Sequence, residues 1–336
     1  EALKLHNLEV DSIVNNEEEP TFQNTILALE NAGSMLSQVA GIFGNLNSAN
    51  KTDSLQAIAA DMAPVLSAHR DEIQLNPKLF ARVKAVYDQK DALGLDKEDI
   101  KLLEETYKGF VRAGANLPEE SKEKLKAINS KLSTLTNSFG DNLPAEAKTY
   151  ELVIEDEKDL AGLPDGVRAA AAATAKEKGK EGKWVFTLSN PSVMPFLQYA
   201  DNRELRKQIW NAYQLRGNNG GEFDNKKNAI EIANLRLEKA KLLGYPSHAA
   251  YVLEESMAEN PENVFNLLNK LWGPALAKAK AEEADLQQEI KLAGDTFQVA
   301  PYDWRYYAEK VRMKRFALNE EEIRPYFGLA EVREGA

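Results

Sequence analysis

The chain has 336 residues, of which 43% are hydrophobic, and its formal net charge is −11. Its length and apolar content are enough for a buried core in one large domain or two ordinary domains. A protein that binds duplex nucleic acid needs a basic face to neutralise phosphates, so nucleic acid is not an expected partner. The sequence has no cysteine, which excludes disulfides, thiolate metal sites and a cysteine nucleophile.

Helical spacing of apolar residues dominates the first 145 positions and predicts five helices there. The first helix runs from Thr21 to about Asn47, with Thr21 as its cap, and the second from about Asp53 to Ile73. A third follows Asn76-Pro77, a fourth covers Asp96 to Arg112 and stops at Gly114, and a fifth has Pro118 in its first turn. We expect these helices to pack as antiparallel neighbours joined by short turns.

Two short runs rich in β-branched and aromatic residues interrupt the helical pattern, at Tyr150–Ile154 and Trp184–Leu188. They flank an alanine-rich helix near Val167–Lys178, and we expect them to pair as a small sheet. Helical spacing then resumes at 203–216, 224–243, 247–257 and 261–292, the last with an expected kink at Gly273-Pro274. Because βαβ units do not recur, the predicted fold class is mainly α, a multi-helix bundle with a small β insertion. A boundary near residue 148 gives two predicted domains, 1–148 and 149–336.

The three histidines do not have the spacing of a helical zinc-peptidase site. That site needs two imidazoles four residues apart with a glutamate between them, H-E-x-x-H, whereas His6, His69 and His248 are far apart. We interpret His248 as a partly exposed residue in the first turn of a helix. No G-x-S-x-G elbow accompanies it, so a serine hydrolase is not supported.

Three further patterns contain residue types that could carry chemistry. The glycine-rich segment Gly217–Gly221 lacks the lysine and hydroxyl of a phosphate-binding loop and is interpreted as a flexible connection. The adjacent pairs Glu254-Glu255 and Glu282-Glu283 are interpreted as solvated surface. The aromatic segment Tyr302–Tyr307 is more unusual, and Asp303 is expected to cap a helix there while the rings divide between core and cavity.

The segment that begins at Asp303 resembles a known family. Asp303-Trp304-Arg305-Tyr306-Tyr307, with the later Arg312 and Pro325-Tyr326-Phe327, is similar to the region before the zinc domain of the thimet oligopeptidase family of metallopeptidases. Four earlier segments resemble its bacterial dipeptidyl carboxypeptidase branch: Pro20-Thr21-Phe22-Gln23-Asn24-Thr25, Asn76-Pro77-Lys78-Leu79-Phe80-Ala81-Arg82-Val83, Phe110-Val111-Arg112-Ala113-Gly114-Ala115, and Leu235-Arg236-Leu237-Glu238-Lys239-Ala240-Lys241-Leu242-Leu243-Gly244.

The resemblance covers nearly the whole chain and implies a two-lobed, mainly helical zinc enzyme. Such an enzyme has a deep channel between its lobes that admits short peptides, and it releases dipeptides from their C-termini. In this family the H-E-x-x-H helix follows the region similar to Pro325-Tyr326-Phe327, and the sequence stops soon after it. We therefore expect no zinc ligand and no catalytic or cofactor-binding residue in this chain.

Two hypotheses follow for the function. The first is the N-terminal portion of a zinc peptidyl-dipeptidase, inactive alone, whose partners are short peptides and the missing C-terminal catalytic portion, with the full-length enzyme a monomer. It predicts an exposed apolar face where the absent lobe docks. The second is a non-catalytic helical binding or scaffold protein derived from the family, with a polar surface throughout.

The sequence also bears on the membrane and the compartment. No segment was found to approach the roughly 18 consecutive apolar residues that span a bilayer, so no membrane partner is expected. The N-terminus lacks the apolar core of a signal peptide, which favours the cytoplasm, with the periplasm as the alternative if a signal peptide has been removed.

Overall fold

The computed structural model describes residues 1–317 and 320–335, and the chain divides into two compact units. The first unit contains Glu1–Asp141 and Asn225–Pro261, and the second contains Asn142–Asp224 and Glu262–Ala336. A segment from the middle of the chain therefore completes the first unit. The predicted division into two domains at residue 148 stays a prediction, because a compact unit is not by itself an independently folding domain.

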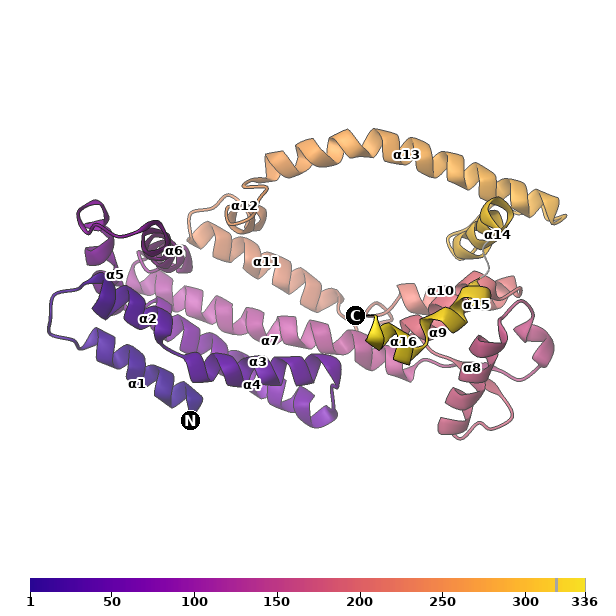
Figure 1. Ribbon diagram of the computed structural model, residues 1–336, viewed down its shortest axis with the longest axis horizontal. Coiled ribbons are helices and arrows are strands. Elements are labelled where there is room, and N and C mark those ends of the chain that lie inside the picture. Colours follow the sequence, from indigo (N-terminus) through magenta and orange to yellow (C-terminus); the bar gives the residue numbers. More distant parts are fainter. Residues whose placement is uncertain (318–319, 336) are drawn as a thin grey trace. The chain divides into compact units, whose positions relative to one another are not determined.

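Every regular element described in the first unit is a helix or helical turn (Figure 1). The elements are α1 (Ala2–Val14), η1 (Phe22–Leu27), α2 (Ala28–Asn31), α3 (Ser34–Ala49), α4 (Asp53–Gln74), α5 (Pro77–Tyr87), η2 (Lys90–Ala92), α6 (Lys97–Ala113), most of α7 (Glu119–Thr149), α11 (Lys226–Leu242) and α12 (His248–Leu253).

Side chains in the sequence set where several of these helices begin and end. The Thr21 hydroxyl accepts a hydrogen bond from the Asn24 amide, and the Asn24 side chain accepts one from the Thr21 amide. Asn76 and Asp96 cap α5 and α6 through their side-chain oxygens. Gly114 ends α6 with a φ of 100°. Each device satisfies backbone groups that a helix end leaves without partners.

The single helix predicted from Thr21 to Asn47 is wrong, because the backbone breaks at Ala32 and Gly33. α2 ends at Asn31, and α3 begins after Gly33, whose φ is 75°. A Cβ atom at this position would lie 2.7 Å from Cε1 of His6. Glycine therefore permits both the left-handed turn and the close approach of α1.

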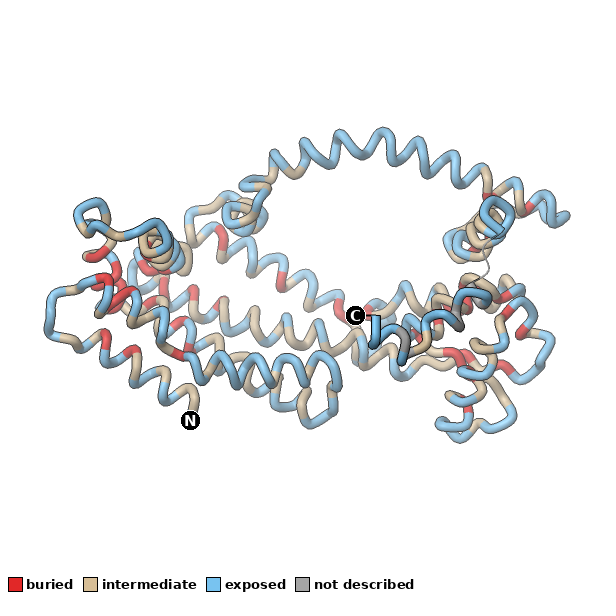
Figure 2. The backbone as a smooth tube through the Cα atoms, viewed as in Figure 1, coloured by how far each residue is buried: buried red, intermediate tan, exposed pale blue. Residues whose placement is uncertain are grey.

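The buried core of the first unit lies where α1, η1, α5 and α6 meet (Figure 2). It is formed by aliphatic and aromatic side chains from these helices: Val10, Ile13, Phe22, Ile26, Leu79, Phe80, Val83, Val86, Leu103, Phe110 and Ala115. Their spacing of three and four residues within each helix is the pattern from which the helices were predicted.

The second unit contains the β insertion and further helices. Its elements are the last turns of α7, β1 (Leu152–Ile154), η3 (Glu157–Leu160), α8 (Asp165–Glu177), β2 (Trp184–Phe186), α9 (Asn190–Tyr199), α10 (Arg203–Gln214), α13 (Pro261–Leu292), α14 (Trp304–Phe316), α15 (Glu320–Ile323), η4 (Arg324–Phe327) and α16 (Leu329–Glu334).

The predicted small sheet is confirmed. β1 and β2 pair antiparallel, with Leu152 opposite Phe186 and Ile154 opposite Trp184. One face of this ribbon packs into a core that includes Phe196 of α9 and Ile209 of α10. A mainly α fold with a small β insertion is therefore the observed class. The helix α9 was not predicted, although Pro191 stands in its first turn as helix starts allow.

The helix predicted from Pro261 to Leu292 forms without interruption as α13 and contains Pro274. The proline at which a kink was predicted does not interrupt the helix, which curves along its length (Figure 1). Only its C-terminal end is buried, where Leu286 and Ile290 pack with Tyr307. Most of the helix is exposed, as the pale blue tube in Figure 2 shows.

One stretch, Phe22–Ala49, corrects the prediction that no segment approaches the limits for a membrane span. This stretch has 28 residues, and an 18-residue window within it has a mean hydropathy of 1.2, so it passes by length and composition. Core helices of soluble proteins also meet these criteria, but only 11% of the window is buried here. The backbone break at Gly33 separates α2 from α3 within the stretch. The absence of a membrane partner stays a prediction.

Candidate functional site at the start of α14

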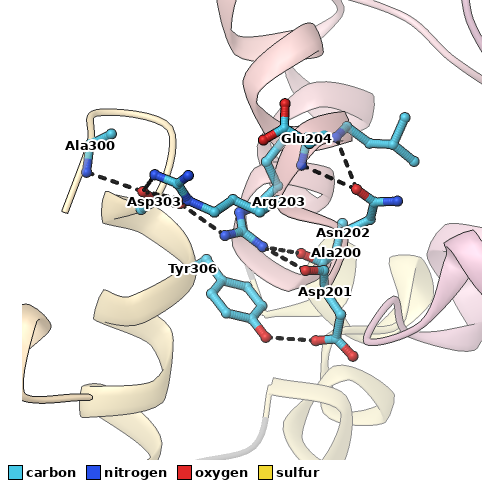
Figure 3. Close-up of polar contacts among 10 residues, drawn as sticks. Ala200, Asp201, Asn202, Arg203, Glu204, Ala300, Asp303 and Tyr306 are labelled. Carbon is cyan, nitrogen blue, oxygen red and sulfur yellow. Dashed lines mark hydrogen bonds and ion pairs between the residues drawn. The ribbon is translucent and has the colours of Figure 1, made fainter. Parts of the chain in front are cut away.

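A buried carboxylate between two arginines organises the start of α14 (Figure 3). The Asp303 side chain is 0% exposed and that of Arg206 is 1% exposed. Arg203 Nε lies 3.0 Å from Asp303 Oδ1, and its Nη2 lies 2.8 Å from Oδ2. Arg206 Nη2 donates to Oδ1 at 3.0 Å, and the Ala300 amide donates to Oδ2 at 3.1 Å. Such a dense set of donors offsets the cost of removing a carboxylate from water.

The two arginines reach Asp303 because of how α10 begins. The Asn202 side chain accepts hydrogen bonds from the Glu204 and Leu205 amides and so caps this helix. Arg203 and Arg206 then stand three residues apart, on one face of the first turn. Arg206 Nη1 also donates to the carbonyl oxygens of Ala200 and Asp201, at 2.8 and 3.0 Å.

Aromatic rings cover the guanidinium groups. The Arg203 guanidinium carbon lies 3.9 Å from the Phe297 ring centre, and that of Arg206 lies 4.0 Å from the Tyr306 ring centre. A cation over a ring face is attracted by the ring quadrupole, most strongly where water is excluded. The rings therefore stabilise charges that burial would otherwise disfavour.

The role predicted for Asp303 is partly wrong. It is the N-cap residue of α14, but its side chain makes no capping hydrogen bond to that helix. Its carboxylate instead binds Arg203 and Arg206, about a hundred residues earlier in the chain, rather than the neighbouring Arg305. The predicted division of the rings is confirmed, since Tyr307 is 4% exposed and Tyr306 lines a cavity.

That cavity, of about 580 Å³, lies beside the cluster and is lined by polar side chains from α9, α13 and α14. Tyr306 donates to Asp201 Oδ1 at 2.7 Å, and burial raises the pKa of Tyr306 well above its usual value. Glu309 accepts hydrogen bonds from Gln198 and Arg312, and the bond from Arg312 lowers the pKa of Glu309. These groups can offer hydrogen bonds to a polar ligand such as a peptide.

A tight turn forms part of the cavity wall. Gly162 has a φ of 83°, and a Cβ atom there would lie 2.2 Å from the Tyr199 carbonyl oxygen. The Asp201 amide also donates to the Ala161 carbonyl at 2.9 Å, which holds the turn against the end of α9. Only glycine fits this position without a backbone shift.

The histidines lie elsewhere and do not form a metal site. His69 Nε2 and His6 Nδ1 are 3.0 Å apart, within hydrogen-bond distance. His248 is the first residue of α12, partly buried after the capping Ser247, which agrees with its interpretation from the sequence. Over residues 1–317 and 320–335, no group of three or more histidine, aspartate or glutamate side chains could hold a metal ion. The described residues therefore do not fit a catalytic zinc, which needs three protein ligands.

Two other interpretations can be compared with the structure. Gly217–Gly221 lies between α10 and α11, as predicted, and the Glu146 carboxylate accepts hydrogen bonds from the Gly217 amide and the Asn219 side chain. Glu254 and Glu255 are not merely solvated, because both form ion pairs with Arg112. No local pattern indicates this contact, since Arg112 lies about 140 residues earlier.

Comparison with known proteins identifies the family. Residues 196–336, which include the Asp303 cluster, match peptidase family M3. The chain is 35% identical to the dipeptidyl carboxypeptidase of Salmonella typhimurium and 36% identical to that of Escherichia coli, over 99% of this chain and 49% of each relative. Residues 196–336 belong to peptidase family M3. It is also 32% identical to oligopeptidase A of Haemophilus influenzae, over 91% of this chain and 46% of that protein.

The chain spans about half the length of the curated relatives that it matches. The family match begins within α9 and continues through the Asp303 cluster, whereas the alignment to the two dipeptidyl carboxypeptidases covers almost the whole chain. The family resemblance seen in the sequence is therefore confirmed.

Proposed function

We propose that this chain is the N-terminal portion of a zinc metallopeptidase that releases C-terminal dipeptides from short peptides. In this proposal the chain forms one side of the substrate channel and supports a catalytic portion that holds the zinc. The identity of 36% to the dipeptidyl carboxypeptidase of Escherichia coli, over 99% of this chain, is the observation that carries the proposal. The cytoplasm remains the compartment that we propose.

We propose that zinc is held by the catalytic portion and not by this chain. His6 and His69 contact each other. No group of three or more histidine, aspartate or glutamate side chains in residues 1–317 and 320–335 is placed to hold a metal ion. The chain's own contribution is therefore binding and positioning, with polar groups such as those around Tyr306 available to a peptide.

The exposed face of α13 favours this proposal over a non-catalytic scaffold. Phe265, Leu268, Leu271 and Trp272 are 62%, 52%, 56% and 68% exposed. Large apolar side chains gathered on one exposed helix are typical of a surface that another part of a protein covers. A scaffold that functions alone would be expected to have a polar surface instead. We propose that the catalytic portion covers this face.

A fusion protein tests the proposal. We would join this chain to the half of the Escherichia coli dipeptidyl carboxypeptidase that has no counterpart here and assay an N-blocked tetrapeptide with zinc. The fusion is expected to release the C-terminal dipeptide, and this chain alone is not. Zinc-dependent hydrolysis by the 336 residues alone would contradict the proposal, and a folded but inactive fusion would favour the scaffold.

A matched pair of substitutions tests the role of α13 in the same fusion. Trp272→Ser removes a large exposed ring from the proposed interface, so we expect a lower melting temperature and lower activity. Met257→Ser alters a side chain that is fully exposed outside this helix, and should change neither. Equal effects of both substitutions would argue against a docking face on α13.

A further inference from the structure

The first unit contains a polar cavity of about 760 Å³ among α4, α6, α7, α11 and α12. Four cationic side chains line it, those of Arg70, Arg112, Arg236 and Lys239, against a single carboxylate, that of Asp71. The chain as a whole carries a net charge of −11. The cationic excess in the cavity is therefore a local feature and not a property of the whole surface.

These four cations differ in how many of their N–H donors already form hydrogen bonds or ion pairs within the protein. Arg112 donates to the Tyr251 carbonyl at 2.7 Å and forms ion pairs with Glu254 and Glu255. By contrast, the side chains of Arg70 and Arg236 have no hydrogen-bond or ion-pair partner within residues 1–317 and 320–335. A guanidinium group has five N–H donors in a planar fork that matches the oxygens of a carboxylate or phosphate.

Lys239 is only partly satisfied. Its Nζ donates to Asn129 Oδ1 at 2.7 Å, and Asn129 Nδ2 in turn donates to Asp71 Oδ1 at 2.8 Å. An ammonium group has three donors, so this relay uses one of them. Burial lowers the pKa of Lys239 and raises the pKa of Asp71, so it disfavours the charged form of both groups.

A histidine adds a further polar group to the cavity wall. His248 lines the cavity, and its Nδ1 is buried with no hydrogen-bond partner. Burial, followed by the nearby Arg236 and Lys239, lowers the pKa of this imidazole. A buried polar atom without a partner is unusual in a folded protein and calls for a ligand, a water or a functional reason.

We propose that this cavity binds a small oxyanion, a carboxylate or a phosphate, through Arg70, Arg236 and Lys239. The cavity is large enough for such a ligand, and its cations come from two helices, α4 and α11, so that an anion between them would be held from two sides. The negative charge of the ligand would balance the cations of the cavity, which the single carboxylate of Asp71 does not balance. This inference concerns a different cavity from the one beside Asp303 and does not depend on the proposed peptidase function.

Titration calorimetry on the 336-residue chain tests the site with two probes, inorganic phosphate and succinate, at low ionic strength. We expect saturable binding of one molecule of at least one probe, and the tighter probe identifies the source of the oxyanion. Arg236→Gln should weaken binding roughly tenfold or more, since hydrogen bonds to charged groups contribute about 1.5–3 kcal/mol. Arg236 is exposed and without a partner, so its replacement should leave the fold intact.

Two further variants separate a site from general charge effects. Lys101→Gln changes the net charge by the same amount, but Lys101 is an exposed residue of α6 paired with Glu105 outside the cavity, so binding should be unchanged. Asp71→Asn removes the one competing carboxylate while keeping an oxygen for Asn129, and should tighten binding. A purely structural cluster would not gain affinity in this way.

The pH dependence gives an independent readout. Because the pKa of Lys239 lies below that of an ordinary lysine, we expect affinity to fall as the pH rises toward the alkaline range, earlier than for an exposed lysine. The proposal is overturned if neither probe binds saturably, or if Lys101→Gln weakens binding as much as Arg236→Gln does.

Discussion

The Asp303 cluster of the second unit and the polar cavity of the first unit use the same kinds of side chain in opposite ways. In the cluster, two arginines and a backbone amide fill the bonding capacity of one carboxylate, and aromatic rings cover the cations. In the cavity, Asp71 accepts a hydrogen bond from Asn129, while Arg70 and Arg236 keep their donors unused among the described residues. A buried carboxylate whose oxygens all accept hydrogen bonds, such as that of Asp303, stabilises the fold, whereas cations with unused donors at a cavity can bind a ligand.

The largest expected effect comes from breaking the saturated cluster. Asp303→Asn removes the negative charge between Arg203 and Arg206, and Arg206 is almost completely buried. Removing one partner of a buried ion pair typically destabilises a protein by about 3–5 kcal/mol, because an uncompensated charge remains. We expect a loss of this size in the free energy of unfolding, measured by urea denaturation.

Asp285→Asn is the matched control for that measurement. Asp285 pairs with Arg315 on the surface of the same unit, and its side chain is 38% exposed. Exposed pairs contribute about 0–1 kcal/mol, so the variant should be close to the parent chain. If the two variants lost similar stability, the Asp303 cluster would not be the structural element that we describe.

This contrast also marks what the sequence can and cannot predict. Helices, their caps and the two strands depend on neighbouring residues, so Thr21, Gly114 and the run at Leu152–Ile154 were interpreted correctly. The partners of Asp303 and Arg112 lie about 100 and 140 residues away, and no local pattern indicates them. Gly33 could have been suspected as a break, since Ala-Gly precedes a serine there, but the apolar spacing continued across it.

The candidate site was predictable only in part. The aromatic segment at Tyr302–Tyr307 could be identified from the sequence, because so many rings are unusual at a helix start, and it is one of the segments that carry the family resemblance. Gln198, Glu309 and Gly162 were missed, because each is ordinary in its local sequence and matters only through the cavity. The same holds for Arg70 and Lys239, which lie on different helices of the first unit.

A second prediction concerns the turn beside the Asp303 cluster. Gly162→Ala forces a side chain into the left-handed region, which costs about 1–2 kcal/mol, and into the Tyr199 carbonyl. With a comparable cost for the overlap, we expect a total loss of roughly 3 kcal/mol in unfolding free energy. The substitution should also alter the cavity, seen as a change in Tyr306 environment by fluorescence or NMR.

Gly179→Ala separates the two causes. Gly179 has a φ of 69°, but no atom lies within 4 Å of the position that a Cβ would take. Only the strain of a side chain in the left-handed region destabilises this variant, so the expected loss in the free energy of unfolding is about 1 kcal/mol. Equal losses at both glycines would show that the contact with Tyr199 is not rigid.

The smallest expected effect on the free energy of unfolding comes from the His6 and His69 pair of the first unit. A hydrogen bond between two imidazoles forms only if at least one of them is neutral. Burial, followed by His69, lowers the pKa of His6 below 6.5, while Glu9 partly opposes this. The unfolded chain then binds a proton more readily than the folded one, so stability is complete above pH 6.5 and falls as the pH drops through the folded pKa.

Urea midpoints at pH 7.5 and pH 5.5 can measure this contribution. His6→Gln keeps a donor for His69 but cannot titrate, so we expect the variant to lose less stability on acidification than the parent chain, by about 0.5 kcal/mol after allowance for solvent screening. His248, whose pKa is also lowered by burial, is present in both chains, so the difference between the parent chain and His6→Gln isolates the contribution of His6. If the parent chain and His6→Gln lost equal stability on acidification, the contact between His6 and His69 would be a packing contact that does not contribute to the pH dependence. The charged groups with unused hydrogen-bonding capacity in the first unit would then be those of the cavity that contains Lys239.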